Sequence, residues 1–154
     1  MKRVSFIVLA VLAVVSLASC RSNKGTVSPA PAEDICAVLG FQYGTNVTVQ
    51  EAKDIADVFR VHFHPSKYKV TEDNRGNSNK RMTKEQMCEV GRSLGAKYVV
   101  VGTINKLMDE YSVDVQVVNV LKETTVAFEG GAFQKADCGK EMENIAKRLA
   151  SKIE

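Results

Sequence analysis

The part of the chain most informative about its architecture is EQMCEVGRSLGAKYVVVGTINKLMDEYSVDVQVVNV, Glu85 to Val120. It begins inside the pattern Thr83-Lys-Glu-Gln86, a capping box in which the two polar side chains satisfy free backbone N–H groups of a helical first turn. Small or apolar residues then repeat at helical spacing: Met87, Val90, Gly91 and Leu94. The sequence therefore predicts a helix with one buried face, capped by Gly95.

The rest of this stretch predicts strands. Tyr98 to Val101 is a continuous apolar run, typical of a strand covered on both faces. After a turn at 108–110, apolar and polar residues alternate: Tyr111, Val113, Val115 and Val117 with Ser112, Asp114 and Gln116. A second turn at Lys122-Glu123 leads to a third strand near 125–128, so we expect an antiparallel meander.

Upstream, the sequence predicts a strand, a helix and a short strand. Ile35 to Phe41 is again a continuous apolar run. A capping box at 48–51 starts a helix with one apolar stripe: Ala52, Ile55, Ala56, Phe59 and Phe63. Because Pro65 cannot continue the helix, Tyr68 to Val70 is a brief strand, and Glu72 to Arg81 is a polar surface loop.

Downstream, Asp137 is expected to cap a last helix whose apolar stripe is Met142, Ile145, Ala146, Leu149 and Ile153. The order β-α-β-α-β-β-β-α predicts an α/β fold: a mixed sheet with two crossover helices and a C-terminal helix packed on it, and antiparallel hairpins in the second half. We expect Val101, Val115 and Leu149 in the core.

The block from Cys88 to Val120, with Gly91, Gly95-Ala96 and Gly102, resembles a periplasmic superfamily. That superfamily includes the amino-terminal domain of TolB, the curli secretion lipoprotein CsgG, and LpoB, the lipoprotein activator of a penicillin-binding protein. The resemblance covers most of 35–153 and implies a TolB-N/CsgG-like fold. Many members have a second cysteine upstream, where this chain has Asn77-Ser78-Asn79-Lys80, so no local disulfide is expected. Gly91 and Gly102 are expected to allow close packing or a bulge.

The first residues predict an export signal. Met1-Lys2-Arg3 is basic, and the uncharged run Phe6 to Ala18 is too short for the roughly 20 residues that span a membrane. Leu17-Ala18-Ser19-Cys20 resembles the bacterial lipobox, which implies cleavage before Cys20 and acylation of its thiol and new amino terminus, with chains such as palmitate. The competing interpretation, a buried cysteine in a core segment, fits the basic start less well. We expect a signal peptide at 1–19, a flexible tether at 20–33 and a single α/β domain at 34–154.

Composition argues against several function classes. The signal peptide holds two of the 21 basic and none of the 18 acidic residues, so the mature chain is near neutral, and no nucleic-acid partner is expected. Enzyme motifs are lacking, which predicts a protein that is not an enzyme and needs no cofactor. His62 and His64 point apart on a helix, so no metal site is expected. Cys36, Cys88 and Cys138 suit buried thiols better than a disulfide framework, although one pair could form.

The sequence thus predicts a lipid-anchored envelope protein that acts by protein contact. The candidate binding surface is the wet strand face, Ser112, Asp114 and Gln116, or the loop Glu72 to Arg81. Because Arg21 is not the aspartate that retains lipoproteins at the inner membrane, we expect the periplasmic side of the outer membrane. Two alternatives follow from the resemblance. A tether that reaches only about 45 Å argues against an activator of a peptidoglycan synthase. The wholly polar insertion Glu72 to Arg81 argues against a CsgG-like secretion subunit, because the strands of a membrane barrel need alternating apolar residues.

Overall fold

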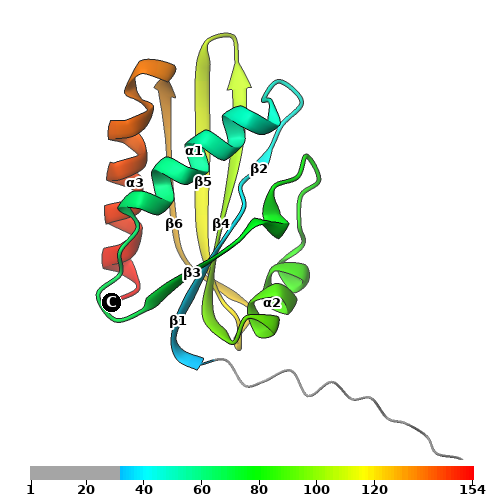
Figure 1. The fold of residues 1–154 in the computed structure, drawn as a ribbon, viewed down its shortest axis with the longest axis vertical. Helices are drawn as coiled ribbons and strands as arrows, with labels where there is room; N and C mark the ends of the chain where they lie inside the picture. Colours follow the sequence, from blue (N-terminus) through cyan, green and yellow to red (C-terminus); the bar gives the residue numbers. More distant parts are fainter. Residues whose placement is uncertain (1–31) are drawn as a thin grey trace, which may run out of the picture.

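The computed structural model describes residues 32–154 as one mixed α/β unit (Figure 1). The predictions for the signal peptide, Cys20 and the tether up to residue 31 lie outside the described residues. In chain order the elements are β1 (Ala32–Leu39), β2 (Gln42–Tyr43), α1 (Val49–His62), β3 (Lys69–Asp73), the 3-10 turn η1 (Asn74–Gly76), α2 (Lys84–Ser93), β4 (Ala96–Leu107), β5 (Glu110–Asn119), β6 (Thr124–Gln134), the 3-10 turn η2 (Lys135–Asp137) and α3 (Cys138–Lys152).

The strands form one sheet in the order β3-β1-β4-β5-β6, and β2 pairs with β4 beyond the end of β1. β1 is parallel to both β3 and β4, whereas β4, β5 and β6 form an antiparallel meander. The predicted mixed sheet, with crossovers first and hairpins second, is confirmed. The two ends of the sheet are the short strand β3 and the long strand β6.

The helices cover both faces of this sheet. The chain steps from β1 to β3 through α1 and then back past β1 to β4 through α2. Because parallel crossovers are right-handed, steps in opposite directions place their helices on opposite faces. Alternate residues of β1 show this arrangement: Cys36 and Val38 belong to the core under α1 and α3, and Ala37 and Leu39 to the core under α2.

The larger core lies between the sheet and the pair α1 and α3. The stripes that the sequence predicted on these helices are buried there, and so are Val115 and Leu149, each fully buried. The rings of Phe59 and Phe63 stack with centroids 5.2 Å apart, and Phe41 meets Phe59 at 5.4 Å. The predicted burial of this helical face is confirmed.

The smaller core lies under α2 and depends on glycine. A Cβ on Gly91 would come within 2.5 Å of Val99 and 2.6 Å of Val120, so only glycine lets α2 pack this closely on the sheet. A Cβ on Gly102 would meet the ring of Phe41 at 2.4 Å, while the β4–β5 register continues past it without a bulge. Gly95 has φ of 65° and ends α2, as predicted.

Several boundaries differ from the predictions. β6 runs from Thr124 to Gln134 instead of 125–128, and β3 includes Glu72 and Asp73, so the polar loop begins later than expected. Both capping boxes form. Asp137 makes no side-chain cap, because it belongs to the helical turn η2 that leads directly into α3. The strand β1 begins at Ala32, two residues before the predicted start of the domain.

Candidate functional site

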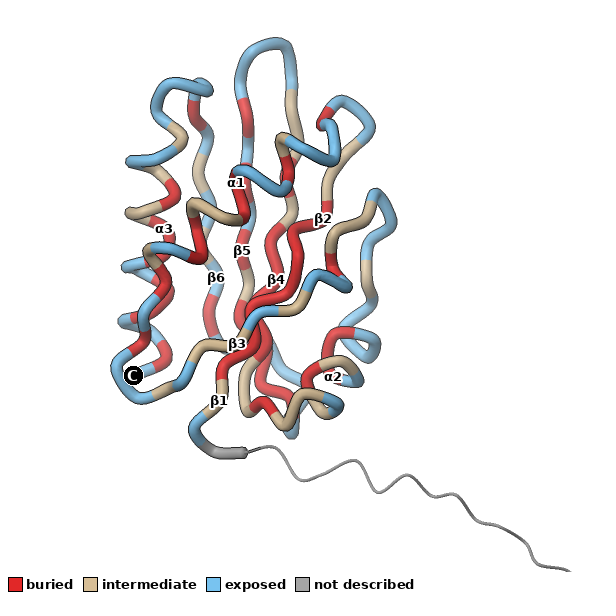
Figure 2. Tube along the Cα trace, in the orientation of Figure 1, coloured by how far each residue is buried: buried red, intermediate tan, exposed pale blue. Residues whose placement is uncertain are grey.

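The predicted wet strand face is the part of the sheet that α2 leaves open. α2 has ten residues and packs on one end of β4 and β5 (Figure 1). Beyond it Ser112 and Asp114 are exposed, and Gln116 is half-buried where its amide reaches the sulfur of Met87 at 3.8 Å. Figure 2 shows the exposed segments of the meander beyond this end. The structure thus brings Ser112, Asp114 and Gln116 together on one surface, which we call the open face.

Antiparallel pairing identifies the other members of the open face, because directly paired residues share a face. Thr103 pairs with Asp114, and Asp114 in turn pairs with Gly130. A Cβ on Gly130 would lie 2.6 Å from an Asp114 carboxylate oxygen, so the glycine leaves room for that carboxylate. Phe128 pairs with Gln116 and is 56% exposed.

A cavity of about 190 Å³ lies on the open face. Its lining combines a cation, an anion, polar groups and an aromatic ring: Arg81, Val101, Thr103, Asp114, Gln116 and Phe128. Arg81 comes from the end of the predicted polar loop, so the two surfaces that the sequence proposed as alternatives meet at this cavity.

A second cavity of about 190 Å³ shares Arg81 and Thr103 with the first and extends the groove toward β2. Gln42 lines it and is 2% exposed, yet its Nε2 has no hydrogen-bond partner within the described residues. Leaving a buried polar group unpaired costs about 1–3 kcal/mol. Asn79 and Asn105 line the same cavity with further amide groups.

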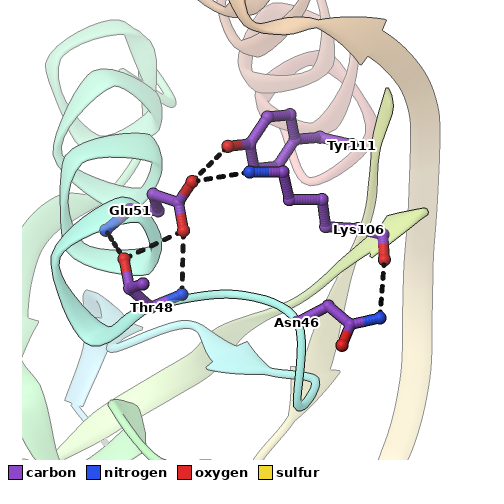
Figure 3. A network of polar contacts seen from close by, with 5 residues as sticks. All are labelled: Asn46, Thr48, Glu51, Lys106 and Tyr111. Carbon is purple, nitrogen blue, oxygen red and sulfur yellow. Dashed lines mark hydrogen bonds and ion pairs between the residues drawn. The ribbon is translucent and has the colours of Figure 1, made fainter. Parts of the chain in front are cut away.

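A separate polar network ties α1 to the β4–β5 hairpin (Figure 3). Glu51 accepts hydrogen bonds from the Tyr111 hydroxyl, the Lys106 ammonium at 2.9 Å and the backbone N–H of Thr48 at 2.9 Å. The Lys106 ammonium also lies 4.8 Å from the centre of the Tyr111 ring. Asn46 donates to the Lys106 carbonyl at 3.4 Å.

These donors hold the pKa of Glu51 far below its ordinary value, with the Tyr111 hydroxyl as the largest cause. In turn, the Glu51 carboxylate raises the pKa of Tyr111. A carboxylate this well paired is a poor general base, because it binds a proton weakly. The network therefore holds α1 against the hairpin, and Glu51 contributes to this contact in addition to its role in the capping box.

Beside the network lies a third cavity, of about 150 Å³, between α1, β5, β6 and the start of α3. Its apolar walls include Ile55, Val58 and Phe133, and the half-buried Cys138 borders it. Burial is the main cause that raises the pKa of the Cys138 thiol. Since the thiolate is the reactive form, this cysteine is not activated as a nucleophile.

The histidines and the two buried cysteines do not line the cavities of the open face. Within residues 32–154 no three histidine, cysteine or carboxylate side chains gather as metal ligands. His62 ends α1, and the His64 ring contacts the carbonyl of Val61. Cys36 and Cys88 are buried free thiols, as expected. None of the helices described is long and apolar enough to cross a membrane.

The sequence predicted the polar strand face but missed Gln42, Thr103 and Phe128. Gln42 follows the apolar run ending at Phe41, and a polar residue there was the available signal. Phe128 was expected in a strand, but only the β5–β6 register shows that it shares a face with Gln116.

No protein-family model matches the chain, and no curated protein matches it in sequence. Solved structures do share its fold. TolB from Acinetobacter baumannii superimposes with a TM-score of 0.55 at 14% identity, over 80% of this chain and 29% of TolB. This chain therefore spans less than a third of that relative.

Two smaller structures cover this chain more evenly. The C-terminal domain of LpoB from Escherichia coli gives a TM-score of 0.50 at 14% identity, over 70% of this chain and 87% of that domain. Lipoprotein GNA1162 from Neisseria meningitidis gives 0.51 at 9% identity, over 75% and 95%. At these identities the likeness concerns the fold alone, and the fold of this chain is TolB-N/LpoB-like.

Proposed function

We propose that this protein is a cell-envelope lipoprotein, anchored through lipid on Cys20, that binds a partner protein through the open face. The observation that carries this proposal is the lining of the open-face groove. Phe128 is exposed there, beside an Arg81 and an Asp114 that have no ion pair within the described residues. Exposed aromatic and arginine side chains around a groove are typical of binding surfaces.

Two observations support the envelope setting. The four residues Leu17-Ala18-Ser19-Cys20 resemble a lipobox, and a protein of the same fold is a lipoprotein of Neisseria meningitidis. Two or more acyl chains give stable membrane attachment where one is marginal. We place the anchor in the outer membrane on its periplasmic side, because the residue after Cys20 is Arg21 and not the aspartate that retains lipoproteins at the inner membrane.

Binding is proposed over catalysis because the best-paired carboxylate and the partly exposed thiol are both poorly suited to chemistry. Glu51 is fully engaged by donors, and the pKa of Cys138 is raised. The open face carries charged and polar groups without a nucleophile and base in contact. Its groove is therefore better suited to recognition.

A peptidoglycan synthase is the finer proposal for the partner. It rests on the LpoB resemblance of the sequence and on the shared fold of the LpoB C-terminal domain. A tether of about 45 Å at full extension limits such an activator to a partner whose domain approaches the outer membrane. A secretion subunit like CsgG remains the alternative.

Site-specific photocrosslinking in intact cells tests the binding proposal. A photoreactive amino acid replaces Ser112 or Phe128 on the open face, and the matched control replaces Val61, which is 66% exposed on α1. We expect a discrete crosslinked protein from the first two positions and none from the control. Identical crosslinks from all three, or none from the open face, would contradict the proposal. A crosslink to further copies of this chain would favour the secretion subunit.

The anchor is tested separately by mass spectrometry of protein extracted from membranes. We expect the mature chain to begin at an acylated Cys20. A Cys20→Ala variant, which removes both the acylated thiol and the cleavage site, should lose the acyl mass and keep its signal peptide. An unprocessed Met1 in the parent, or a mature chain without the acyl mass, would refute the anchor and leave the binding proposal standing.

A further inference from the structure

The open-face groove has a polar lining in which the charges of Arg81 and Asp114 and the amide donor of Gln42 have no partner among the described residues. The two adjoining cavities of about 190 Å³ each meet at Arg81 and Thr103. Together they reach the lower end of the roughly 300–1,000 Å³ range of ligand pockets. A groove of this size holds a short chain segment rather than a folded surface.

One end of the groove carries a buried amide that lacks a partner. Gln42 is 98% buried, and its Nε2 has no acceptor within residues 32–154. Gln42 lines the second cavity, and the terminal torsion of a glutamine is broad, so rotation about it can present the amide to a group bound there. Buried polar groups in folded proteins are almost always paired, so this unpaired donor is available to an acceptor that a ligand supplies.

The middle of the groove carries two opposite charges. Neither the Arg81 guanidinium nor the Asp114 carboxylate forms an ion pair or hydrogen bond with another described residue, although both line one cavity. The guanidinium fork suits a carboxylate. Asp114 leans over Gly130 and suits an ammonium or guanidinium group.

These features distinguish a glycan from an extended peptide as the occupant of the groove. A neutral glycan could bond to the amides of Gln42 and Asn79, but it would leave both charges desolvated without partners. An acidic glycan would serve Arg81 and be repelled by Asp114. An extended peptide offers main-chain acceptors at every residue and can carry an acidic and a basic side chain together, so it is the occupant that meets all of these groups.

We propose that the groove binds an extended segment of the partner protein that carries both an acidic and a basic residue, the acidic one at Arg81 and the basic one at Asp114. The segment places a main-chain carbonyl at Gln42 and an apolar side chain on Phe128. This inference rests on the proposed function and specifies the part of the partner that the open face recognises.

The test titrates capped hexapeptides into the full mature chain purified in detergent. The peptides share a Ser, Thr and Val frame. One series carries Glu and Lys in both orders at separations of two and four residues, and the matched series replace Glu, Lys or both by Gln. We expect saturable calorimetric binding by at least one Glu-and-Lys peptide, with amide resonances of 103–105, 114–116 and 128–130 shifting, and a Kd about three- to tenfold weaker for each charge removed.

Variants assign the charges. Arg81→Gln should abolish the advantage of Glu in the peptide and leave that of Lys, and Asp114→Asn should do the reverse. The controls Lys80→Gln and Asp109→Asn remove like charges near the groove that do not line it, and should bind as the parent does. If both controls weaken binding as much as the groove variants, the effect is nonspecific attraction and the inference fails.

Gln42→Leu separates recognition from structure. Because the buried amide has no partner, leucine should raise the melting temperature while it weakens peptide binding. A lower melting temperature with unchanged affinity would show a structural role and overturn the assignment of Gln42. Saturable binding of chitotetraose in place of every peptide would replace the peptide by a glycan. Failure of all peptides while the crosslinks at 112 and 128 persist would refute this inference and leave the proposed function intact.

Discussion

On the face of the sheet under α1 and α3, the carboxylates of Glu51 and Glu129 are paired, whereas, among residues 32–154, Asp114 and Arg81 on the open face are not. Glu129 of β6 accepts hydrogen bonds from Arg148 and Lys152 of α3, and Glu51 accepts from Lys106 and Tyr111. Asp114 and Arg81 have no such partners within the described residues. The same sheet therefore uses charge to hold helices on one face and leaves charge available on the other.

The comparison implies that substitutions on the helix-covered face cost stability and that substitutions on the open face do not. The largest effect is expected from Leu149→Ala, because the side chain is fully buried between α3 and the sheet. We expect it to lower the free energy of unfolding by about 2–4 kcal/mol, and Val115→Ala by less. Denaturant titration measures both losses. A variant that unfolds like the parent would show that this helix does not pack as described.

The second effect tests close packing behind the open face. Gly102→Ala places a Cβ against the buried ring of Phe41, and overpacking of this kind costs about 1–3 kcal/mol. The matched control is Gly139→Ala in the first turn of α3, where a Cβ meets nothing within 4 Å. Alanine there should be neutral or stabilise by up to about 1 kcal/mol. Equal losses from both variants would contradict the packing.

The third effect depends on pH. Because hydrogen bonds lower the folded-state pKa of Glu51 from an ordinary value of 4.5, its contribution to stability is fully present above about pH 4.5 and is lost as the pH falls through the folded value. Glu51→Gln should lower the melting temperature at pH 7 and flatten its decline below pH 4.5. Glu89→Gln, an exposed carboxylate on α2, is the control. Parallel pH profiles for Glu51→Gln and the parent would show that the Glu51 network does not stabilise the contact between α1 and the hairpin.

These positions also show what local sequence could predict. Buried stripes such as that of Leu149, both capping boxes and the wet strand face follow from spacing alone, because helices and strands have fixed periods. The strand β6 was predicted too short, since Glu129, Gly130 and Gly131 interrupt its apolar pattern. Glu129 tolerates this position because α3 supplies its two cationic partners.

The open-face groove shows the limit more sharply. Gln42 forms a strand of two residues that exists only through pairing with β4, far away in the chain. Arg81 was placed in a polar loop, and nothing local indicates that it lines the same cavity as Asp114. Such contacts are set by strand register and helix length, which apolar periodicity does not fix.

The smallest expected effect on stability is the sharpest test of the comparison. Asp114 and Glu129 are carboxylates on neighbouring strands, but Glu129 is held by α3 and Asp114 faces the groove. Asp114→Asn should therefore change the free energy of unfolding by no more than about 0.5 kcal/mol. Glu129→Gln should clearly lower the free energy of unfolding, and by less at high salt, because salt screens the ion pairs of Glu129 in the parent. Crosslinking from position 128 should respond in the opposite order, falling with Asp114→Asn and persisting with Glu129→Gln. If Asp114→Asn destabilised the protein as much as Glu129→Gln, the charge of Asp114 would be structural. The claim that charge stabilises the helix-covered face but is available for binding on the open face would then be wrong.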